Sequence, residues 1–293
     1  MRIQRFFRIT WTMGRLVGSW RSGLAGLLLI ASGLLSGCDL QQDVEVDLPP
    51  YPAQLVVECY LESGKVPQLT VTESAPYLSD PTPKVPTDVT VVLTGPDGRA
   101  ETLRLLPGQD PVTKKLFTHR GRQPLTIRPG DTWRLEVTDT KGRRVTGTAT
   151  MPALVPIDSV EWKFNDEPPG RRKALVIVNF QDPAATADFY RLQIHHDSLS
   201  EDSRALDRDF DDRLFNGQKV PMGTSYEFAA NDTLLITFHH LDRPYYYFLR
   251  SIDDAQSANG NPFGQPAQIQ STVQGGLGVF AILSYERRQV VVQ

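Results

Sequence analysis

Two pairs of adjacent histidines, His195-His196 and His239-His240, have side chains suited to metal binding. Adjacent residues on a strand point to opposite faces, so at most one histidine of each pair can converge on one ion. His196 and His240 share the apolar phase of their segments, and two neighbouring strands could bring them together. No further ligand is spaced to complete a zinc site. The pattern therefore favours polar strand ends at a sheet rim, and no metal site is predicted.

Acidic residues at alternate positions over Asp207–Asp211 resemble the start of a calcium loop. The sixth position is Asp212, where the sharp turn requires glycine, and the twelfth is Gln218, where a bidentate glutamate is needed. Interleaved arginines can neutralise the acids. The highly charged segment Glu201–Arg213 is therefore predicted to be a solvated loop or a short helix, and weak calcium binding by Asp207–Asp212 remains open.

Signatures of catalysis are weak in this sequence. It contains no Gly-x-Ser-x-Gly elbow for a nucleophilic serine and no glycine-rich phosphate loop before a helix. A pair of carboxylates that are remote in sequence could still hydrolyse glycosides. We predict a protein that is not an enzyme, with no catalytic residues and no cofactor.

Cys38 carries the clearest chemical signal. It follows Leu35-Ser36-Gly37 and the apolar run Gly23–Leu34, and five arginines and no acids precede that run. A basic segment, an apolar segment and small residues before a cleavage site form a secretory signal. The cysteine at the cut resembles the bacterial lipobox, in which it is acylated and becomes the mature N-terminus. The alternative is a transmembrane anchor, but the run is shorter than the roughly 18–20 residues of a span.

Residues 1–37 are thus predicted to be a lipoprotein signal peptide, starting at Met1 or Met13. Residues 38–52 are polar, acidic and proline-bearing, which indicates a flexible tether. The whole chain has a formal charge of −3, and removing the signal's arginines makes the remainder more acidic. This excludes nucleic acid as the expected partner, because phosphates require clusters of Lys and Arg. Cys59 lies in an apolar strand phase and is predicted to be a buried hydrophobe.

The remaining sequence predicts an all-β protein with two sandwich-like domains, 53–151 and 157–293. Short alternating runs such as Asp88–Thr94 end at turn residues such as Gly95–Gly98. The first domain is expected to be immunoglobulin-like, and prolines mark a linker over Met151–Pro156. In the second domain, Leu175–Phe180 is predicted to be a central strand. Tyr245–Ile252 is ambiguous between strand and helix.

A turn-rich loop, Gly260–Pro266, contains the candidate binding residues Asn261 and Phe263. Loops on rigid β scaffolds often carry recognition, so the region Asn261–Phe280 is the predicted contact surface. In the alternative, Phe263 plugs the end of the sandwich. The glycines of Gly275–Phe280 suit a bulge or the close approach of another backbone.

Several of these motifs together resemble the domain-of-unknown-function 4249 lipoproteins of Bacteroidetes. The resemblance covers nearly the whole chain after Cys38, although Ser271-Thr272-Val273 stands where members often have Ser-Asn-Ile. The motifs are the lipobox Cys38 with the acidic, proline-bearing stretch after it, Leu55-Val56-Val57-Glu58, Met151-Pro152, Ile157-Asp158-Ser159-Val160, Phe210-Asp211-Asp212-Arg213-Leu214-Phe215-Asn216-Gly217, Asn261-Pro262-Phe263 and Gly275-Gly276-Leu277-Gly278-Val279-Phe280.

The resemblance implies a cell-envelope lipoprotein whose gene commonly lies beside that of a TonB-dependent outer-membrane transporter. It supplies no catalytic residues. The function expected from it is a non-catalytic lipoprotein of the outer membrane, a partner of such a transporter in nutrient capture or uptake. The alternatives are an envelope adhesin or assembly factor that binds protein or glycan without a transporter, and, less favoured, a hydrolase. The ligand, the transporter and the membrane face are left open.

Overall fold

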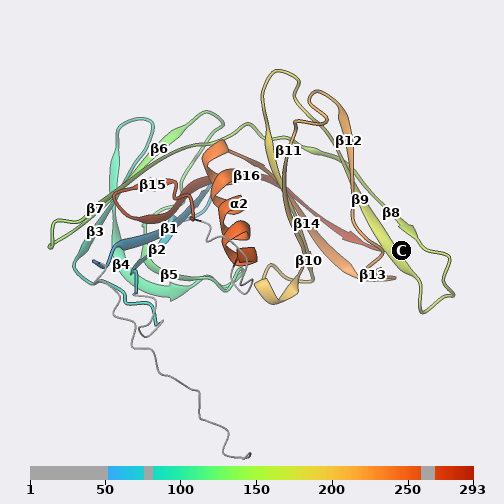
Figure 1. The fold of residues 1–293 in the computed structure, drawn as a ribbon, viewed down its shortest axis with the longest axis horizontal. Helices are drawn as coiled ribbons and strands as arrows, with labels where there is room; N and C mark the ends of the chain where they lie inside the picture. Colours follow the sequence, from blue (N-terminus) through green and yellow to red (C-terminus); the bar gives the residue numbers. More distant parts are fainter. Residues whose placement is uncertain (1–51, 76–81, 259–267) are drawn as a thin grey trace, which may run out of the picture. The chain divides into compact units, whose positions relative to one another are not determined.

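The computed structural model describes residues 52–75, 82–258 and 268–293, and most of them lie in strands (Figure 1). The predicted all-β fold is confirmed. Twelve strands form one continuous hydrogen-bonded sheet in the order β11-β10-β14-β16-β1-β2-β5-β4-β3-β6-β7-β15, and β8, β9, β12 and β13 form a second sheet.

The first half of the described chain, joined by the short strand β15 from near the C-terminus, folds into two facing layers. Their strands are β1 (Leu55–Glu62), β2 (Gln68–Glu73), β3 (Val89–Thr94), β4 (Ala100–Gln109), β5 (Leu116–Arg120), β6 (Thr132–Asp139), β7 (Arg144–Thr150) and β15 (Val273–Gln274). Strand β4 pairs with both β5 and β3, and so passes from one layer to the other. The turn predicted at Gly95–Gly98 joins β3 to β4, with Gly98 at φ 78°.

Alternating side chains from both layers fill a shared core. In β1, Leu55, Val57 and Leu61 are fully buried, and so is Cys59, as predicted. Burial, reinforced by the neighbouring charge of Glu58, raises the pKa of the Cys59 thiol, so this cysteine stays protonated and packs as a small hydrophobe.

The second half packs in layers around its own core. Its elements are β8 (Ile157–Phe164), β9 (Lys173–Gln181), β10 (Phe189–His196), the 3₁₀ turn η1 (Glu201–Ser203), β11 (Arg204–Asp211), β12 (Lys219–Gly223), β13 (Phe228–Ala229) and β14 (Thr233–Leu241). The predicted central strand is β9, which pairs with β8 on one side and with β12 and β13 on the other. Its core includes Phe180, Tyr190 and Phe238.

Strand β16 (Leu277–Val291) belongs to both halves. Its first part, Leu277–Leu283, runs parallel to β1, and its second part, Ser284–Val291, runs antiparallel to β14. The chain passes from the first core to the second between Met151, which packs on the first, and Val155, which belongs to the second. Residues 51–293 nevertheless form one compact unit, because β16 continues the sheet through both halves. The two-domain division and the immunoglobulin-like topology therefore stay predictions.

Helix α2 (Arg243–Ala258) resolves the ambiguity at Tyr245–Ile252. The Asp242 carboxylate accepts a hydrogen bond from the Tyr245 N–H (3.0 Å), as an N-cap does, and Pro244 suits the first turn. Its buried face, which includes Tyr245 and Phe248, packs against β16. No helix among the described residues is long and apolar enough to cross a membrane.

The predicted loop or helix at Glu201–Arg213 is wrong. After the short turn η1, this segment forms strand β11, which pairs with β10 at the edge of the sheet. Its acidic side chains are compatible with a strand because arginines neutralise them. Arg191 of the neighbouring β10 pairs with Asp207, and Arg213, just after the strand, pairs with Asp211. The apolar Leu206 and Phe210 pack on the second core.

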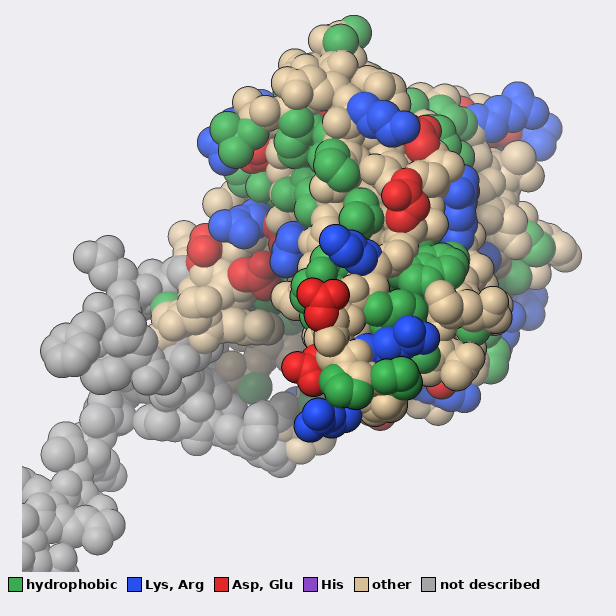
Figure 2. Space-filling view, turned by 90° about the vertical axis from the view of Figure 1, so that its right-hand side faces the viewer, with side chains coloured by type: hydrophobic (Ala, Val, Ile, Leu, Met, Phe, Trp, Pro, Cys, Tyr) green, Lys and Arg blue, Asp and Glu red, His purple; other side chains and the backbone are tan. Residues whose placement is uncertain are grey.

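On the side of β8 and β9, the surface of the second half carries side chains of all types. Figure 2 shows basic, acidic and apolar groups interspersed there, without an extended area of one charge. A face of this kind offers no electrostatic track for a nucleic-acid backbone.

Candidate functional site

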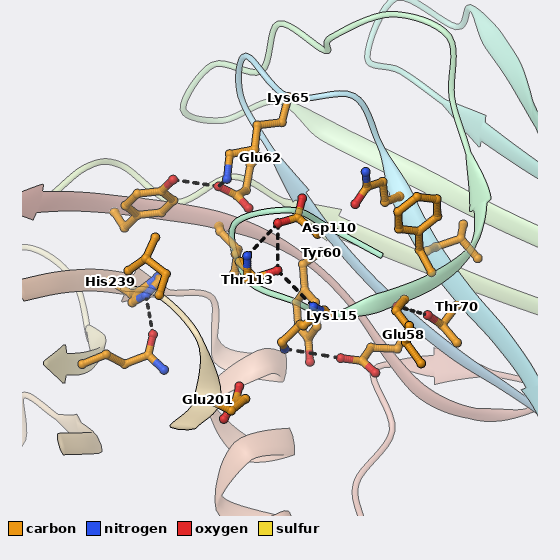
Figure 3. A pocket seen from close by; sticks show the side chains of 18 of the residues that line it. Glu58, Tyr60, Glu62, Lys65, Thr70, Asp110, Thr113, Lys115, Glu201 and His239 are labelled. Atoms are coloured by element: carbon orange, nitrogen blue, oxygen red, sulfur yellow. Dashed lines mark hydrogen bonds and ion pairs between the residues drawn. The ribbon is translucent and has the colours of Figure 1, made fainter. Parts of the chain in front are cut away.

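A cavity of about 690 Å³ lies where the two halves meet, and we call it the junction cavity (Figure 3). Its floor is the face of β1, β16, β14 and β10 that points away from both cores. Helix α2, the β4–β5 hairpin and the segment around η1 line its sides. Cavities of roughly 300–1,000 Å³ are the usual size for small-molecule sites.

Strand alternation places polar side chains on this floor. In β1 the apolar residues enter the first core, so Glu58, Tyr60 and Glu62 face the cavity. In β10 the residues Tyr190, Leu192 and Ile194 enter the second core. Arg191, Gln193 and His195 therefore face the cavity.

Arg191 and Asp207 form the best-defined polar pair in the cavity. Two hydrogen bonds join them, Nε to Oδ1 at 2.7 Å and Nη2 to Oδ2 at 2.6 Å. Arg191 also donates to the Tyr245 hydroxyl (3.1 Å), and Arg204 reaches Asp207 at 2.8 Å. Burial alone would raise the pKa of Asp207, but the hydrogen bonds and charge of Arg191 outweigh it and hold that pKa below its usual value. The pair fixes β10, β11 and α2 together.

Tyr60 lies between a cation and a second tyrosine. The Lys115 ammonium is 5.1 Å from the centre of its ring and 3.7 Å from a Glu58 carboxylate oxygen. The Tyr245 ring packs against Tyr60 at a tilt, with centroids 5.7 Å apart. The loop before Lys115 is held by Asp110, whose carboxylate accepts hydrogen bonds from the N–H and hydroxyl of Thr113 (Figure 3).

At the other side of the cavity, Glu62 binds two partners. It accepts a hydrogen bond from the Tyr285 hydroxyl (2.7 Å) and pairs with Lys65 (2.8 Å). Burial and the negative charge of Glu62 raise the pKa of Tyr285 to about 12, so the phenol stays protonated. The Arg287 guanidinium lies over the Tyr285 ring at 4.8 Å.

His239 is a neutral imidazole in this environment. Burial, and then the positive charges of Arg191 and Arg287, lower its pKa to about 3. Its Nε2 lies 3.2 Å from the Gln193 side-chain oxygen. His195 also lines the cavity, and burial lowers its pKa as well. Neither histidine adds positive charge to the cavity at neutral pH.

The possible convergence of His196 with His240 does not occur. In the antiparallel register His196 faces Leu234 and His240 faces Tyr190, so the two histidines lie at opposite ends of the strand pair. His240 instead bonds the Asp188 carboxylate (2.8 Å) inside the second half.

A second polar cluster contains the carboxylates of Asp182, Asp188 and Asp212, with one oxygen of each within 4.8 Å of the others. All three are buried. Tyr190 donates to Asp182 (2.6 Å) and His240 contacts Asp188. Three carboxylate oxygens are the ligand type that hard cations such as Ca²⁺ prefer. The calcium loop considered for Asp207–Asp212 is not formed, because its two ends lie in different places. Asp207 faces the junction cavity, whereas Asp212 joins the buried cluster.

The predicted site residues Cys38, Asn261 and Phe263 lie outside the described residues. The glycines of the segment Gly275–Phe280 are described, and they permit the close backbone approach that was predicted. A Cβ on Gly278 would stand 2.0 Å from the Val57 carbonyl oxygen, and one on Gly275 would stand 2.2 Å from that of Arg144. Phe280 is buried in the first core. Gly275, Gly278 and Phe280 therefore serve packing, whereas Ile269 and Leu277 of the same region are exposed, and recognition by Asn261–Phe280 stays a prediction.

The junction cavity was not predicted from the sequence. The pattern that points to it is the alternation of polar with buried residues along two strands. Arg191, Gln193 and His195 alternate with buried residues in β10, and Glu58, Tyr60 and Glu62 do so in β1. That alternation identifies side chains that avoid both cores, but only the strand order brings β1 and β10 onto one face.

Comparisons with known proteins identify a family for this chain. The sequence profile described as "Domain of unknown function (DUF4249)" matches residues 41–289. No curated protein matches the chain. Among solved structures, pullulanase from Anoxybacillus sp. LM18-11 is similar over 63% of this chain and 24% of its own, with 13% identity and a TM-score of 0.21. Its complex with maltotriose gives 14% identity and a TM-score of 0.19 over the same shares. This chain thus spans about a quarter of that enzyme.

Proposed function

This chain belongs to the DUF4249 family, and we propose that it is a non-catalytic lipoprotein of the cell envelope that holds a ligand in the junction cavity. The observation that carries the proposal is the cavity itself. Its 690 Å³ lie on a continuous sheet whose strands are fixed by two hydrophobic cores. A rigid floor with polar groups held in place by ion pairs suits selective binding.

Binding is favoured over catalysis by the state of the cavity's reactive groups. Among the described residues that line it, the carboxylates of Glu58, Glu62 and Asp207 are each held by a cation. His239 contacts an amide rather than a hydroxyl or thiol that it could activate. A nucleophile and base within hydrogen-bond reach would favour an enzyme.

The anchor in this proposal is a lipid on Cys38. Several acyl chains hold a protein on a membrane firmly, whereas one chain does so marginally. Cys38→Ser should leave the protein unprocessed or released from the membrane. Radiolabelled palmitate that entered this variant, together with continued membrane attachment, would contradict the anchor.

The partner in this proposal is a TonB-dependent outer-membrane transporter, and the joint role is nutrient capture or uptake. The family resemblance supports this partnership. So does the β4–β5 hairpin beside the cavity, which exposes four large apolar side chains. They are Leu105, Leu106, Val112 and Leu116. Exposed apolar side chains on one element are a common feature of protein contacts.

Affinity purification from native outer membrane after mild crosslinking tests the partnership. We expect a transporter barrel to co-purify with the wild-type chain and with Leu214→Glu, a change at an exposed leucine away from the hairpin. Leu116→Glu should reduce its recovery several-fold. Equal recovery of all three chains would exclude the hairpin as the contact. Recovery of other envelope proteins or glycan without a transporter would favour an adhesin or assembly factor.

A further inference from the structure

The charges that line the junction cavity are largely committed to one another. Lys115 pairs with Glu58 at 3.7 Å, and Lys65 pairs with Glu62 at 2.8 Å. Two further pairs involve arginines, Arg191 with Asp207 at 2.6 Å and Arg204 with Glu201 at 2.9 Å. A charged ligand group that bound at one of these pairs would displace one partner and leave it uncompensated.

The remaining charges do not build an ion site. Within the described part of the chain, Arg120 and Arg287 are the lining cations without a carboxylate in ion-pair distance. Arg287 donates to the Thr237 hydroxyl (2.8 Å) and covers Tyr285. Asp110 is occupied by the turn that it caps, and Asp253, which forms no ion pair with a described cation, is exposed on α2. The lining contains six acidic and six basic side chains, so it has no formal charge with which to attract an anion or a cation.

The lining also combines rings with hydrogen-bonding groups. Tyr60, Tyr245 and Tyr285 line it together with aliphatic side chains such as Leu283. A pure hydrocarbon ligand would remove water from the ion pairs without replacing its hydrogen bonds, at a cost in free energy. Hydroxyl groups avoid that cost, because each can donate to a carboxylate and accept from a guanidinium.

The floor excludes recognition of a peptide by strand addition. Strands β10, β14 and β16 each have a hydrogen-bonded neighbour on both sides. Strand addition requires a free sheet edge, whereas the cavity lies on a sheet face.

We propose that the junction cavity takes an uncharged, hydroxyl-rich ligand, the chemistry of a neutral oligosaccharide. The inference rests on the proposed binding function and specifies the ligand class for that same site. Paired carboxylates and guanidinium groups supply hydrogen bonds to hydroxyls, and aliphatic side chains such as Leu283 and the exposed Leu116 offer apolar surface to the sugar rings.

The test uses the full lipidated chain in detergent on an array of neutral and uronic-acid-containing oligosaccharides. We expect retention of one or more neutral oligosaccharides, at least tenfold stronger than of acidic glycans of equal length. Raising the salt from about 50 to 500 mM should change this retention less than twofold, because no net charge is exchanged. Retention of acidic glycans alone, retention that salt abolishes, or no retention at all would overturn the inference.

A pair of conservative variants assigns the selectivity to the cavity. Glu58→Gln frees Lys115 at a half-exposed position and should strengthen retention of acidic glycans relative to neutral ones several-fold. Glu136→Gln breaks a similarly exposed pair with Arg144 on β6 and β7, away from the cavity, and should leave the ratio unchanged. Equal behaviour of the two variants would contradict a charge-paired cavity as the selective element. A transporter that co-purifies with a chain retaining no glycan would keep the proposed function and remove only this ligand class.

Discussion

Tyr190 is fully buried, and its hydroxyl donates to the Asp182 carboxylate at 2.6 Å. Asp182 also accepts the Gly217 N–H (2.7 Å). In a cluster of three buried carboxylates, each such donor offsets part of the cost of desolvation. The phenol is therefore a structural partner of Asp182 as well as a core side chain.

Tyr190→Phe should lower the free energy of unfolding by about 1–3 kcal/mol, because it removes the donor and keeps the ring. Tyr226→Phe, at an exposed tyrosine, is the control and should change it by less than about 0.5 kcal/mol. Denaturant unfolding of the two variants measures the difference. Equal stability of both would show that this hydrogen bond contributes nothing.

At this scale the sequence predicts single-residue environments better than partnerships. The phase of one strand was enough to predict that Cys59 is buried, and glycine chemistry was enough to predict close approach near Gly278. The pair Arg191–Asp207 depends on the register between β10 and β11, which no local pattern specifies. The charge of the segment around Asp207 therefore suggested a loop.

Helix α2 begins at an N-cap that titrates near neutral pH. Burial raises the pKa of Asp242 to about 6, although the Tyr245 N–H hydrogen bond acts in the opposite direction. An unfolded aspartate has a pKa of about 3.9, so the folded state binds the proton more tightly. This contribution stabilises the fold fully below pH about 4 and is lost as the pH rises through about 6.

Asp242→Asn keeps the cap and removes the titration, since Asn caps about as well as Asp. The stability of the wild type relative to this variant should fall by about 2 kcal/mol between pH 4 and pH 7. Chemical unfolding of both proteins at a series of pH values checks the sign. A relative stability that rises over this interval would contradict a raised pKa.

Strand β16 requires glycine where it meets β1. Gly278 has φ 116°, and an added Cβ would clash with the Val57 carbonyl oxygen at 2.0 Å. Gly278→Ala should cost more than about 3 kcal/mol of unfolding free energy. Gly98→Ala has a similarly positive φ of 78° but open space around it, and should cost about 1–2 kcal/mol. Thermal unfolding of both variants separates backbone approach from φ strain; equal losses would refute the close contact.

Across the whole described molecule, β16 links two hydrophobic cores through one sheet. The sequence predicted the two strand series and the change near Leu154, because alternation and prolines are local signals. It did not predict the shared strand, because the pairing of β16 with both β1 and β14 joins segments that are distant in sequence. The junction cavity follows from that pairing, so it could not be predicted either.

A shared strand should make the two halves unfold together. Leu61→Ala in the first core and Leu192→Ala in the second each remove a fully buried side chain and should each cost about 2–5 kcal/mol. We expect both to shift a single calorimetric transition to lower temperature. Two transitions, of which each variant moves only one, would show instead that the halves unfold as independent domains.

The most direct test of the junction cavity as a binding site is native mass spectrometry of the protein purified from its own membrane. We expect the wild type to carry a non-covalent small molecule. Leu214→Trp, at an exposed leucine outside the cavity, should carry the same mass. Gln193→Trp places a large ring on the cavity floor and should lose that mass while its thermal midpoint confirms folding. A wild type without bound mass, or a Gln193→Trp chain that retains it, would contradict ligand binding in the junction cavity.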